Sequence, residues 1–253
     1  MKELKVIKIG GKVAEDDQTL DRFLRDFHQI AGPKILVHGG GVLATQLSEQ
    51  MGLQTQMIDG RRITNAQTLD VVTMVYGGLI NKRLVAKLQA VGQNAVGLTG
   101  ADLNIIQAKK RSTQPIDFGW VGDVETVKTD WLNQFLDHDV VPVIAPLTHD
   151  GKGHMLNTNA DNMAGFISAE LANIYSVELI FCFDRPGVMH GEDVIKTIDR
   201  HLYEELKTKE IISDGMIPKL VLGFQALEHN VNNVTIKHVQ NVLIEQTGTQ
   251  LVL

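Results

Sequence analysis

The chain has 253 residues and a formal net charge of −6, from 24 Lys and Arg against 30 Asp and Glu. Hydrophobic residues make up 43% and charged residues 21%, so the chain can bury a full core and is neither disordered nor fibrous. An acidic balance without a Lys/Arg block argues against nucleic acid or an anionic membrane as the main partner. An anion would therefore have to bind at a local site. Some of the 23 glycines could form one if they cluster after strands, where they expose backbone N–H groups.

Cys182 is the single cysteine, which excludes an intrachain disulfide and a cysteine-based zinc site and is typical of a reducing compartment. The nine histidines show no metal-ligand spacing, so we expect no metal held by protein side chains. The longest apolar run in the strand-like segments, about 140–147, is far shorter than the ~20 residues that a membrane-spanning helix needs. Residues 1–5 lack a signal-peptide pattern. We therefore expect a cytoplasmic protein.

Short apolar runs alternate with amphipathic stretches along most of the chain, which predicts an α/β fold with a mainly parallel sheet. Strands are expected at residues 4–9, 34–37, 94–98, 140–145, 177–183 and 233–236. Helices are expected after Asp16 or Asp17 to about residue 30, from about Val42, and at residues 130–136, 160–171, 202–209 and 215–228.

Three further features of the chain concern its organisation. Thr64 is expected to cap a long helix over residues 65–90, with Gly77 and Gly78 as a weak point inside it. Residues 105–127 and 147–157 interrupt the alternation, and both are typical of β-hairpins. A soft boundary near residues 172–176 predicts an N-terminal lobe, 1–173, and a C-terminal lobe, 174–253.

Glycines follow the first two expected strands, as Lys8-Ile9-Gly10-Gly11 and His38-Gly39-Gly40-Gly41. Ligands of an open parallel sheet lie beyond the carboxyl ends of its strands. Three consecutive glycines would cost a helix about 1 kcal/mol each, so we interpret them as a loop that exposes backbone N–H groups to an anion at a helix N-terminus. A purely structural turn is the alternative for the first pair.

The second glycine segment also fits a dinucleotide fingerprint loosely. Gly39, Gly41 and Ala44 have the required spacing, and Asp59 follows twenty positions after Gly39 as a possible ribose partner. An NAD-dependent Rossmann dehydrogenase therefore stays open at this point. The P-loop spacing G-x-x-x-x-G-K-[ST] is absent from the sequence.

Charged and amide side chains gather in further segments. Arg61 and Arg62 precede an expected helix, and a guanidinium can bind a substrate carboxylate in bidentate fashion, although a solvated surface pair is the alternative. Residues 157–161 carry more amide and carboxylate groups than one helix cap needs. Residues 184–188 follow an apolar strand, and Lys219 lies in the first turn of an expected helix, where it opposes the helix dipole unless an anion is present.

Taken in order, these segments resemble the amino acid kinase family along nearly the whole chain. The resemblance implies a three-layer αβα sandwich with a central, mainly parallel open sheet. It also implies ATP-dependent phosphorylation of the γ-carboxylate of an N-acylated glutamate to an acyl phosphate, a step of arginine biosynthesis. The other segments that carry the resemblance are 60–64, Asn81-Lys82, 96–100, 121–124, 142–146 and 214–219.

The resemblance implies a role for each matching residue. Lys8 and Lys219 would stabilise charge on the transferring phosphoryl group, Asp161 would orient both lysines, and Gly10 and Gly11 would form a phosphate loop. The implied acylglutamate contacts are Gly40, Gly41, Arg62 and Asn157. The implied nucleotide contacts are Asp184, Gly187, Val188, Met189, Ile211, Ile212 and Ser213. The cofactor would be ATP with Mg²⁺ carried by its phosphates.

The chemistry agrees with these implied roles. Phosphoryl transfer between two anions depends on positioning and positive charge, and a carboxylate acceptor needs no general base. The resemblance implies a homodimer and leaves acetyl and succinyl open as the acyl group. The resemblance also implies that arginine-inhibited members of the family carry a helical extension before the first strand, which builds a ring-like hexamer. Only three residues precede Leu4 here, so we expect neither arginine inhibition nor that hexamer. Arg185 and Pro186 depart from the family pattern.

Three alternatives stand beside the phosphorylation of an N-acylated glutamate. A sister kinase could act on another carboxylate or on carbamate, and the Rossmann dehydrogenase belongs to a different class. A non-catalytic ligand sensor on the same fold is the third, and the presence of Lys8, Lys219 and Asp161 argues against it.

Overall fold

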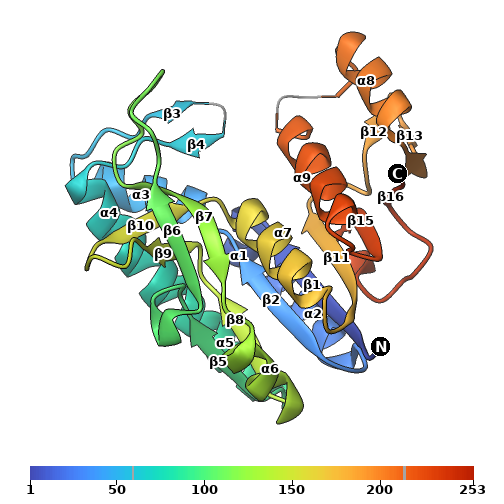
Figure 1. The fold of residues 1–253 in the computed structure, drawn as a ribbon, viewed down its shortest axis with the longest axis horizontal. Coiled ribbons are helices and arrows are strands. Elements are labelled where there is room, and N and C mark those ends of the chain that lie inside the picture. The colour runs from blue at the N-terminus through green and yellow to red at the C-terminus, as the bar shows by residue number, and fades with distance from the viewer. Residues whose placement is uncertain (59, 213–214) are drawn as a thin grey trace.

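A central sheet of eight strands runs through the computed structural model, which describes residues 1–58, 60–212 and 215–253. The strand order is β14-β16-β15-β11-β1-β2-β8-β5, and of these pairings β15–β16 is antiparallel and the others are parallel (Figure 1). The strands are β1 (Glu3–Ile9), β2 (Lys34–His38), β5 (Ala95–Leu98), β8 (Val141–Ile144), β11 (Ser176–Phe183), β14 (Thr197–Ile198), β15 (Asn233–His238) and β16 (Thr249–Leu251).

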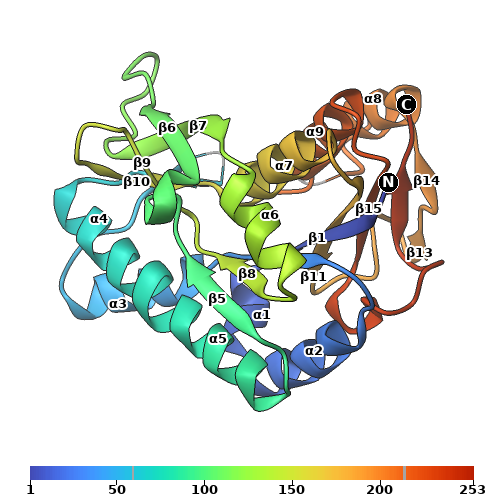
Figure 2. The same ribbon diagram turned by 60° about the horizontal axis from the view of Figure 1, so that its bottom comes forward.

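Helices cover both faces of this sheet. Figure 2 shows α7 (Ala160–Leu171) and α9 (Ile217–Glu228) on one side, and α2 (Asp17–Gln29) and α5 (Asn81–Ala90) on the other. The other helices, apart from a π-helix between α4 and α5, are α1 (Gly11–Glu15), α3 (Gly41–Gln50), α4 (Ala66–Val72), α6 (Asp130–Asp137), α8 (Arg200–Thr208) and the 3₁₀ turns η2 (Asp102–Asn104) and η3 (Val239–Asn241). This arrangement confirms the predicted three-layer αβα sandwich.

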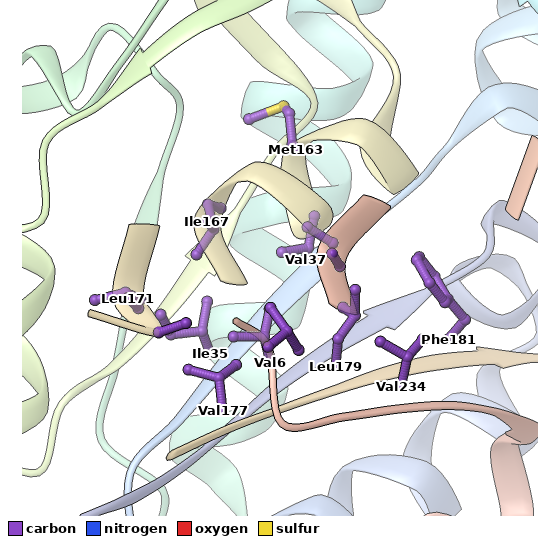
Figure 3. Close-up of a cluster of buried hydrophobic side chains, with 14 of the residues drawn as sticks. Val6, Ile35, Val37, Met163, Ile167, Leu171, Val177, Leu179, Phe181 and Val234 are labelled. Atoms are coloured by element: carbon purple, nitrogen blue, oxygen red, sulfur yellow. The ribbon is translucent and has the colours of Figure 1, made fainter. Parts of the chain in front are cut away.

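Two apolar clusters fill the spaces between the layers, because successive strand side chains point to opposite faces. Val6 of β1 packs with Ile167 and Leu171 of α7, in the cluster drawn in Figure 3. Ile7, the next residue, packs on the other face in the cluster that includes Phe23 of α2. Strands that are buried on both faces consist of nearly continuous apolar residues, and for that reason the sequence predicts their positions well.

Four short strands form a separate closed barrel in the order β10-β7-β6-β9. They are β6 (Ile106–Lys110), β7 (Val121–Val127), β9 (Leu147–His149) and β10 (Met155–Thr158). The pairs β6–β7 and β9–β10 are antiparallel, which confirms the two predicted hairpins. The joining of the hairpins, through the parallel pair of β7 and β10, was not predicted.

The predicted long helix after Thr64 differs from the structure in two ways. Its N-cap is Asn65, whose side chain accepts a hydrogen bond from Thr68 N, whereas Thr64 is buried and donates to the Arg62 carbonyl oxygen. The helix also changes to a π-helix, η1 (Thr73–Ile80), between α4 and α5, and Gly77 and Gly78 lie in that segment.

Several short elements were not predicted. Besides α1, these are the hairpin strands β3 (Met57–Ile58) and β4 (Arg61–Arg62), β12 (Met189–His190), β13 (Asp193–Val194), and the sheet strands β14 and β16. Most of them have two residues, too few to show an alternating pattern. No helix among the described residues is long and apolar enough to cross a membrane.

Candidate active site

The two glycine segments meet beyond the ends of neighbouring parallel strands. Lys8 of β1 lies opposite Val37 of β2, and Gly39 N donates a hydrogen bond to the Ile9 carbonyl oxygen at 3.0 Å. A Cβ at Gly11 would lie only 3.1 and 3.2 Å from the backbone nitrogens of Gly41 and Gly40. The close approach of two backbones therefore explains the glycine at position 11.

A single carboxylate joins two lysines at this point. Lys8 Nζ lies 2.7 Å from Oδ1 of Asp161, and Lys219 Nζ donates to Oδ2 of Asp161 at 2.9 Å. Asp161 stands in the first turn of α7, Lys8 at the end of β1 and Lys219 in the first turn of α9, so three elements converge. The structure thus brings together the three residues predicted as catalytic.

Burial governs the electrostatics of this cluster. Burial alone would raise the pKa of Asp161, but the ammonium groups of Lys8 and Lys219 outweigh it and hold that pKa well below its usual range. Burial lowers the pKa of Lys8, and the charge of Asp161 opposes that change. The cluster carries two positive charges against one negative charge, so it favours an incoming anion.

Arg62 is buried beside the second glycine loop. Its Nη2 donates to the Gly41 carbonyl oxygen at 2.7 Å and to Thr45 Oγ1 at 2.8 Å, and its Nη1 donates to Thr55 Oγ1 at 3.1 Å. The guanidinium is therefore held in one orientation by α3 and the segment before β3. Thr45 and Thr55 were not predicted as site residues, and a lone threonine gives no sequence signal.

Asn157 is tied to the same hairpin segment. Its Nδ2 donates to Thr64 Oγ1 at 3.0 Å, and Thr64 in turn donates to the Arg62 carbonyl oxygen at 2.9 Å. This chain of hydrogen bonds fixes the amide of β10 relative to Arg62.

A first cavity of ≈ 240 Å³ lies between these groups. This cavity is lined both by residues predicted as catalytic and by residues predicted to bind the substrate. The first and last of these residues are more than half of the chain apart in the sequence. Its walls include Lys8, Gly11, Gly40, Gly41, Arg62, Tyr76, Asn157 and Asp161. Tyr76 was not predicted as a site residue, because it lies within an apolar helical segment and its neighbours in the sequence give no functional signal.

A second cavity of ≈ 590 Å³ lies on the C-terminal side. It is lined by the predicted residues Lys8, Gly10, Gly11, Asp184, Gly187, Val188, Met189, Ile211, Ile212 and Lys219. The predicted Ser213 lies outside the described residues. Lys8 and Gly11 line both cavities, so the two cavities meet at the lysine–carboxylate cluster.

Lys12 also lines the second cavity, and its Nζ lies 3.3 Å from Oδ2 of Asp184. This lysine was not predicted, although it directly follows Gly10 and Gly11 in the sequence. Arg185 lines the same cavity.

The N-terminus of α3 is less open to an anion than the sequence suggested. Glu15 Oε1 accepts a hydrogen bond from Leu43 N at 2.8 Å, so a protein carboxylate already satisfies one of the N–H groups. Burial raises the pKa of Glu15, and the Leu43 hydrogen bond opposes that rise.

His38 and Cys182 have structural surroundings. His38 is fully buried, its Nδ1 lies 2.8 Å from the Gly39 carbonyl oxygen, and its Nε2 lies 3.2 Å from Asn81 Nδ2. This pairing requires a neutral ring that donates from Nδ1 and accepts at Nε2, and burial lowers the pKa of His38 to about 4. Cys182 is buried, as predicted, and burial raises the pKa of its thiol to about 12.

The fold and the two-cavity site define a class of protein, and comparison with known proteins identifies it. The sequence model of the amino acid kinase family matches residues 3–238. This chain belongs to the amino acid kinase family.

Several curated relatives within that family are named acetylglutamate kinase. An acetylglutamate kinase of Phocaeicola vulgatus is 50% identical, and the alignment covers 98% of each chain. An acetylglutamate kinase of Parabacteroides distasonis is 49% identical over 96% of each chain. One of Methanopyrus kandleri is 39% identical over 97% of this chain and 99% of the relative.

Solved structures agree on the fold. The smu.665 protein of Streptococcus mutans has a TM-score of 0.83 and 28% identity, and the superposition covers 100% of this chain and 99% of the other. N-acetylglutamate synthase of Neisseria gonorrhoeae has a TM-score of 0.85 at 19% identity, and this chain covers 59% of it. At that identity the second likeness shows the fold alone.

The Rossmann dehydrogenase alternative is not favoured. Relatives at about 50% identity over nearly the whole chain are named acetylglutamate kinase, and Asp59, the possible ribose partner, lies outside the described residues. A dinucleotide site at Gly39 would also leave the cluster of Lys8, Asp161 and Lys219 without a function.

Proposed function

We propose that this protein transfers the γ-phosphoryl group of ATP to the γ-carboxylate of N-acetyl-L-glutamate, forming the acyl phosphate in arginine biosynthesis. The observation that carries the proposal is the meeting of two cavities at Lys8, beside the carboxylate that holds Lys219. The names of relatives at about 50% identity over nearly the whole chain support the same substrate pair.

The first cavity is the proposed acylglutamate site, within residues 1–173. Arg62 would bind a substrate carboxylate, since its fixed planar guanidinium suits bidentate pairing. Gly40 and Gly41 would offer backbone N–H groups, and Asn157 would offer its amide. The small volume of ≈ 240 Å³ suits an amino-acid derivative rather than a nucleotide.

The second cavity is the proposed ATP site, within residues 174–253 and the glycine turn of β1. Gly187, Val188, Ile211 and Ile212 give it apolar and backbone walls that suit a base and ribose. Lys8, Lys219 and the N–H groups of Gly10 and Gly11 would face the phosphates. The division into an acylglutamate lobe and a nucleotide lobe is part of this proposal.

Mg²⁺ belongs to the proposed reaction as a partner of the nucleotide. Among the described residues no three His, Cys, Asp or Glu side chains gather as a metal site, and both oxygens of Asp161 already face lysines. The protein residues therefore suit a metal carried by the phosphates. When bound, Mg²⁺ would neutralise phosphate oxygens.

Charge stabilisation by the two lysines is the central catalytic step that we propose. As the γ-phosphoryl group moves between two oxygens, its equatorial oxygens and the leaving oxygen carry negative charge, and Lys8 and Lys219 would lie beside it. Asp161 is a positioning residue that fixes both ammonium groups before substrate arrives. The carboxylate acceptor is ionised at neutral pH, so no side chain has to remove a proton from it.

A homodimer in the cytoplasm is the proposed working form. Met74 and Leu79 of η1 are 51% and 45% exposed, an apolar surface that a second copy would cover. The free, buried Cys182 suits a reducing compartment. Sedimentation equilibrium tests the assembly, and a monomer at micromolar concentration would contradict it.

The activity is tested by trapping the product with hydroxylamine, which displaces phosphate from an acyl phosphate and forms a hydroxamate, and the hydroxamate is detected as its coloured iron(III) complex. We expect hydroxamate only with ATP, Mg²⁺ and an N-acylglutamate together. Carbamate and free glutamate serve as alternative acceptors, and a preference for either would point to a sister kinase. Thermal shift by ATP with Mg²⁺ but not by NAD separates a kinase from a dehydrogenase.

A further inference from the structure

Lys12 is a cation at the proposed ATP site to which the proposed function assigns no role. It lines the second cavity but not the first, and its ion-pair partner is Asp184. Lys8 lines both cavities, and Lys219 contacts Asp161 where the two cavities meet. The acceptor carboxylate would lie in the first cavity, so Lys12 stands on the nucleotide side of the two lysines that flank the transferred group.

The packing of α1 presents Lys12 to the second cavity. Val13 and Ala14 of this helix are only 3% and 2% exposed and belong to one of the two apolar clusters. Glu15 accepts the hydrogen bond from Leu43 N, so α1 is also fixed to α3. Lys12 is the one exposed residue of the helix. Its ammonium group therefore extends from a support that is already held on its other sides.

The ion pair of Lys12 joins two segments that are far apart in the sequence. Lys12 Nζ lies 3.3 Å from Oδ2 of Asp184, 172 positions later, because α1 and Asp184 follow the neighbouring parallel strands β1 and β11. The two side chains are 76% and 55% exposed. An exposed ion pair contributes little to stability, since water screens it and both side chains lose rotamer freedom. Phosphate oxygens can therefore replace the carboxylate as partners of the ammonium group at little cost.

We propose that Lys12 binds the β-phosphate of the nucleotide and exchanges Asp184 for phosphate oxygens when ATP enters the second cavity. Lys12 directly follows Gly11, which lines both cavities, so we assign to it the phosphate next to the transferred one. Lys12 then selects nucleoside di- and triphosphates over monophosphates and contributes to binding rather than to the transfer step. This inference rests on the proposed function and deepens its account of the nucleotide site.

Calorimetric titration of the full-length protein with ATP, ADP and AMP tests the contact, at constant Mg²⁺ and without acylglutamate. Lys12→Gln removes the charge but keeps a polar side chain. We expect it to raise Kd for ATP and ADP by about three- to tenfold and to leave Kd for AMP within about twofold, because AMP has no β-phosphate. Unchanged Kd values for ATP and ADP would overturn the proposal, and so would an equal rise for AMP.

The matched control is Lys109→Gln. Lys109 is an exposed lysine of β6 that pairs with Glu125 and lines neither of the two cavities. This variant should keep all three Kd values. An equal loss of ATP affinity in both variants would show a general effect of surface charge and overturn the assignment to Lys12.

Steady-state kinetics separates a binding lysine from a catalytic one. In Lys12→Gln we expect KM for ATP and the inhibition constant of ADP to rise by the same factor, since both ligands carry the β-phosphate. We expect kcat and KM for the acylglutamate to stay within about twofold, because the transferred phosphoryl group keeps Lys8 and Lys219. A large fall in kcat at an unchanged KM for ATP would overturn the assignment.

Protection from an amine-specific acetylating reagent tests the exchange of partners in the unaltered protein. With the modified lysines mapped by mass spectrometry, we expect ATP with Mg²⁺ to slow acetylation of Lys12, AMP to have little effect, and Lys109 to react equally in every sample. Acetylation of Lys12 at one rate with and without ATP would overturn the proposal.

These measurements also distinguish this inference from the proposed function. Binding of ATP that depends on Lys12, without any hydroxamate from an N-acylglutamate, would refute the kinase reaction and support the phosphate contact. Hydroxamate formation with the same KM for ATP in wild type and Lys12→Gln would support the kinase reaction and refute the role of Lys12.

Discussion

Lys8 Nζ lies 2.7 Å from Oδ1 of Asp161, where both side chains are only 9% exposed, and Lys219 Nζ contacts the other oxygen of the same carboxylate. A buried ion pair is weak evidence for stability, because desolvation offsets most of the attraction. The role of this ion pair is better explained by the positions of its groups, since the Asp161 carboxylate aligns the two lysine ammonium groups where the two cavities meet.

Replacing either lysine should act on the chemical step. We expect Lys8→Ala and Lys219→Ala to lower kcat by about 10²–10³-fold. Each variant lacks an ammonium group whose attraction to the phosphoryl oxygens is stronger in the transition state than in the ground state. Steady-state kinetics measures this, with Lys87→Ala, a surface lysine paired with Asp21, as the control. Either variant at the wild-type rate would contradict the assignment.

Asp161→Asn should give a similar loss by a different route. The amide keeps the shape but offers one acceptor oxygen and no charge, so it cannot align both lysines. We expect kcat to fall by about 10²-fold with a smaller change in KM. Asp21→Asn removes one carboxylate of an exposed lysine pair and should leave both constants unchanged. A loss confined to KM would argue that Asp161 has a binding role only.

Arg62→Ala should raise KM for the acylglutamate by about 10–100-fold, the cost of one charge-assisted carboxylate pair. Arg62→Lys should not restore it, because a single ammonium cannot replace the three hydrogen bonds to Gly41, Thr45 and Thr55. KM for ATP is the internal control. An equal rise in both KM values would indicate general damage to the fold.

The main layers of the fold could be predicted from the sequence, because the buried parallel strands are continuous apolar runs. The strands expected at residues 4–9 and 177–183 are β1 and β11, and the helix expected at residues 160–171 is α7. The barrel could not be predicted, since it depends on the pairing of Asn157 with Val121, a long-range contact that leaves no local pattern.

The candidate site was predicted only as separate segments. Lys8, Gly11 and Arg62 could be predicted because they belong to glycine clusters or charged segments near strand ends. Such residues are locally unfavourable for folding, and a bound ligand explains why they are present. Arg61 was predicted as one of a pair, whereas the structure separates the two: Arg62 donates hydrogen bonds to α3, and Arg61 also lines a neighbouring cavity with Arg111 and Asp123. Which of two adjacent arginines is held by protein acceptors depends on three-dimensional neighbours.

The two glycines of the first loop should respond differently to a methyl group. At Gly11 an added Cβ meets the backbone of Gly40 and Gly41 at 3.1–3.2 Å, and backbone cannot move aside as a side chain can. We expect Gly11→Ala to cost about 1–3 kcal/mol of stability, a drop in Tm of about 2–12 °C for a chain of this length. Gly10 has an ordinary φ of −74° and no described atom within 4 Å, so Gly10→Ala should keep Tm within about 1 °C. Equal thermal shifts would contradict the packing of the two loops.

Mild acid should destabilise the protein through His38. The ordinary pKa near 6.5 applies to the unfolded chain, and burial lowers the folded value to about 4. Between these values the unfolded state binds the proton and the folded state does not, so this contribution is full above about pH 6.5 and is lost as the pH falls towards 4. Protonation would also remove the Nε2 acceptor that faces Asn81.

For this histidine we expect the free energy of unfolding in urea to be about 2 kcal/mol lower at pH 5 than at pH 7.5. His38→Gln has no titrating ring and keeps an acceptor for the Asn81 amide, so it should remove that part of the pH dependence even if its overall stability is lower. His190→Gln, at an exposed position, should keep it. An equal loss between the two pH values in wild type and His38→Gln would place the titrating group elsewhere, because a neutral amide at position 38 cannot bind the proton.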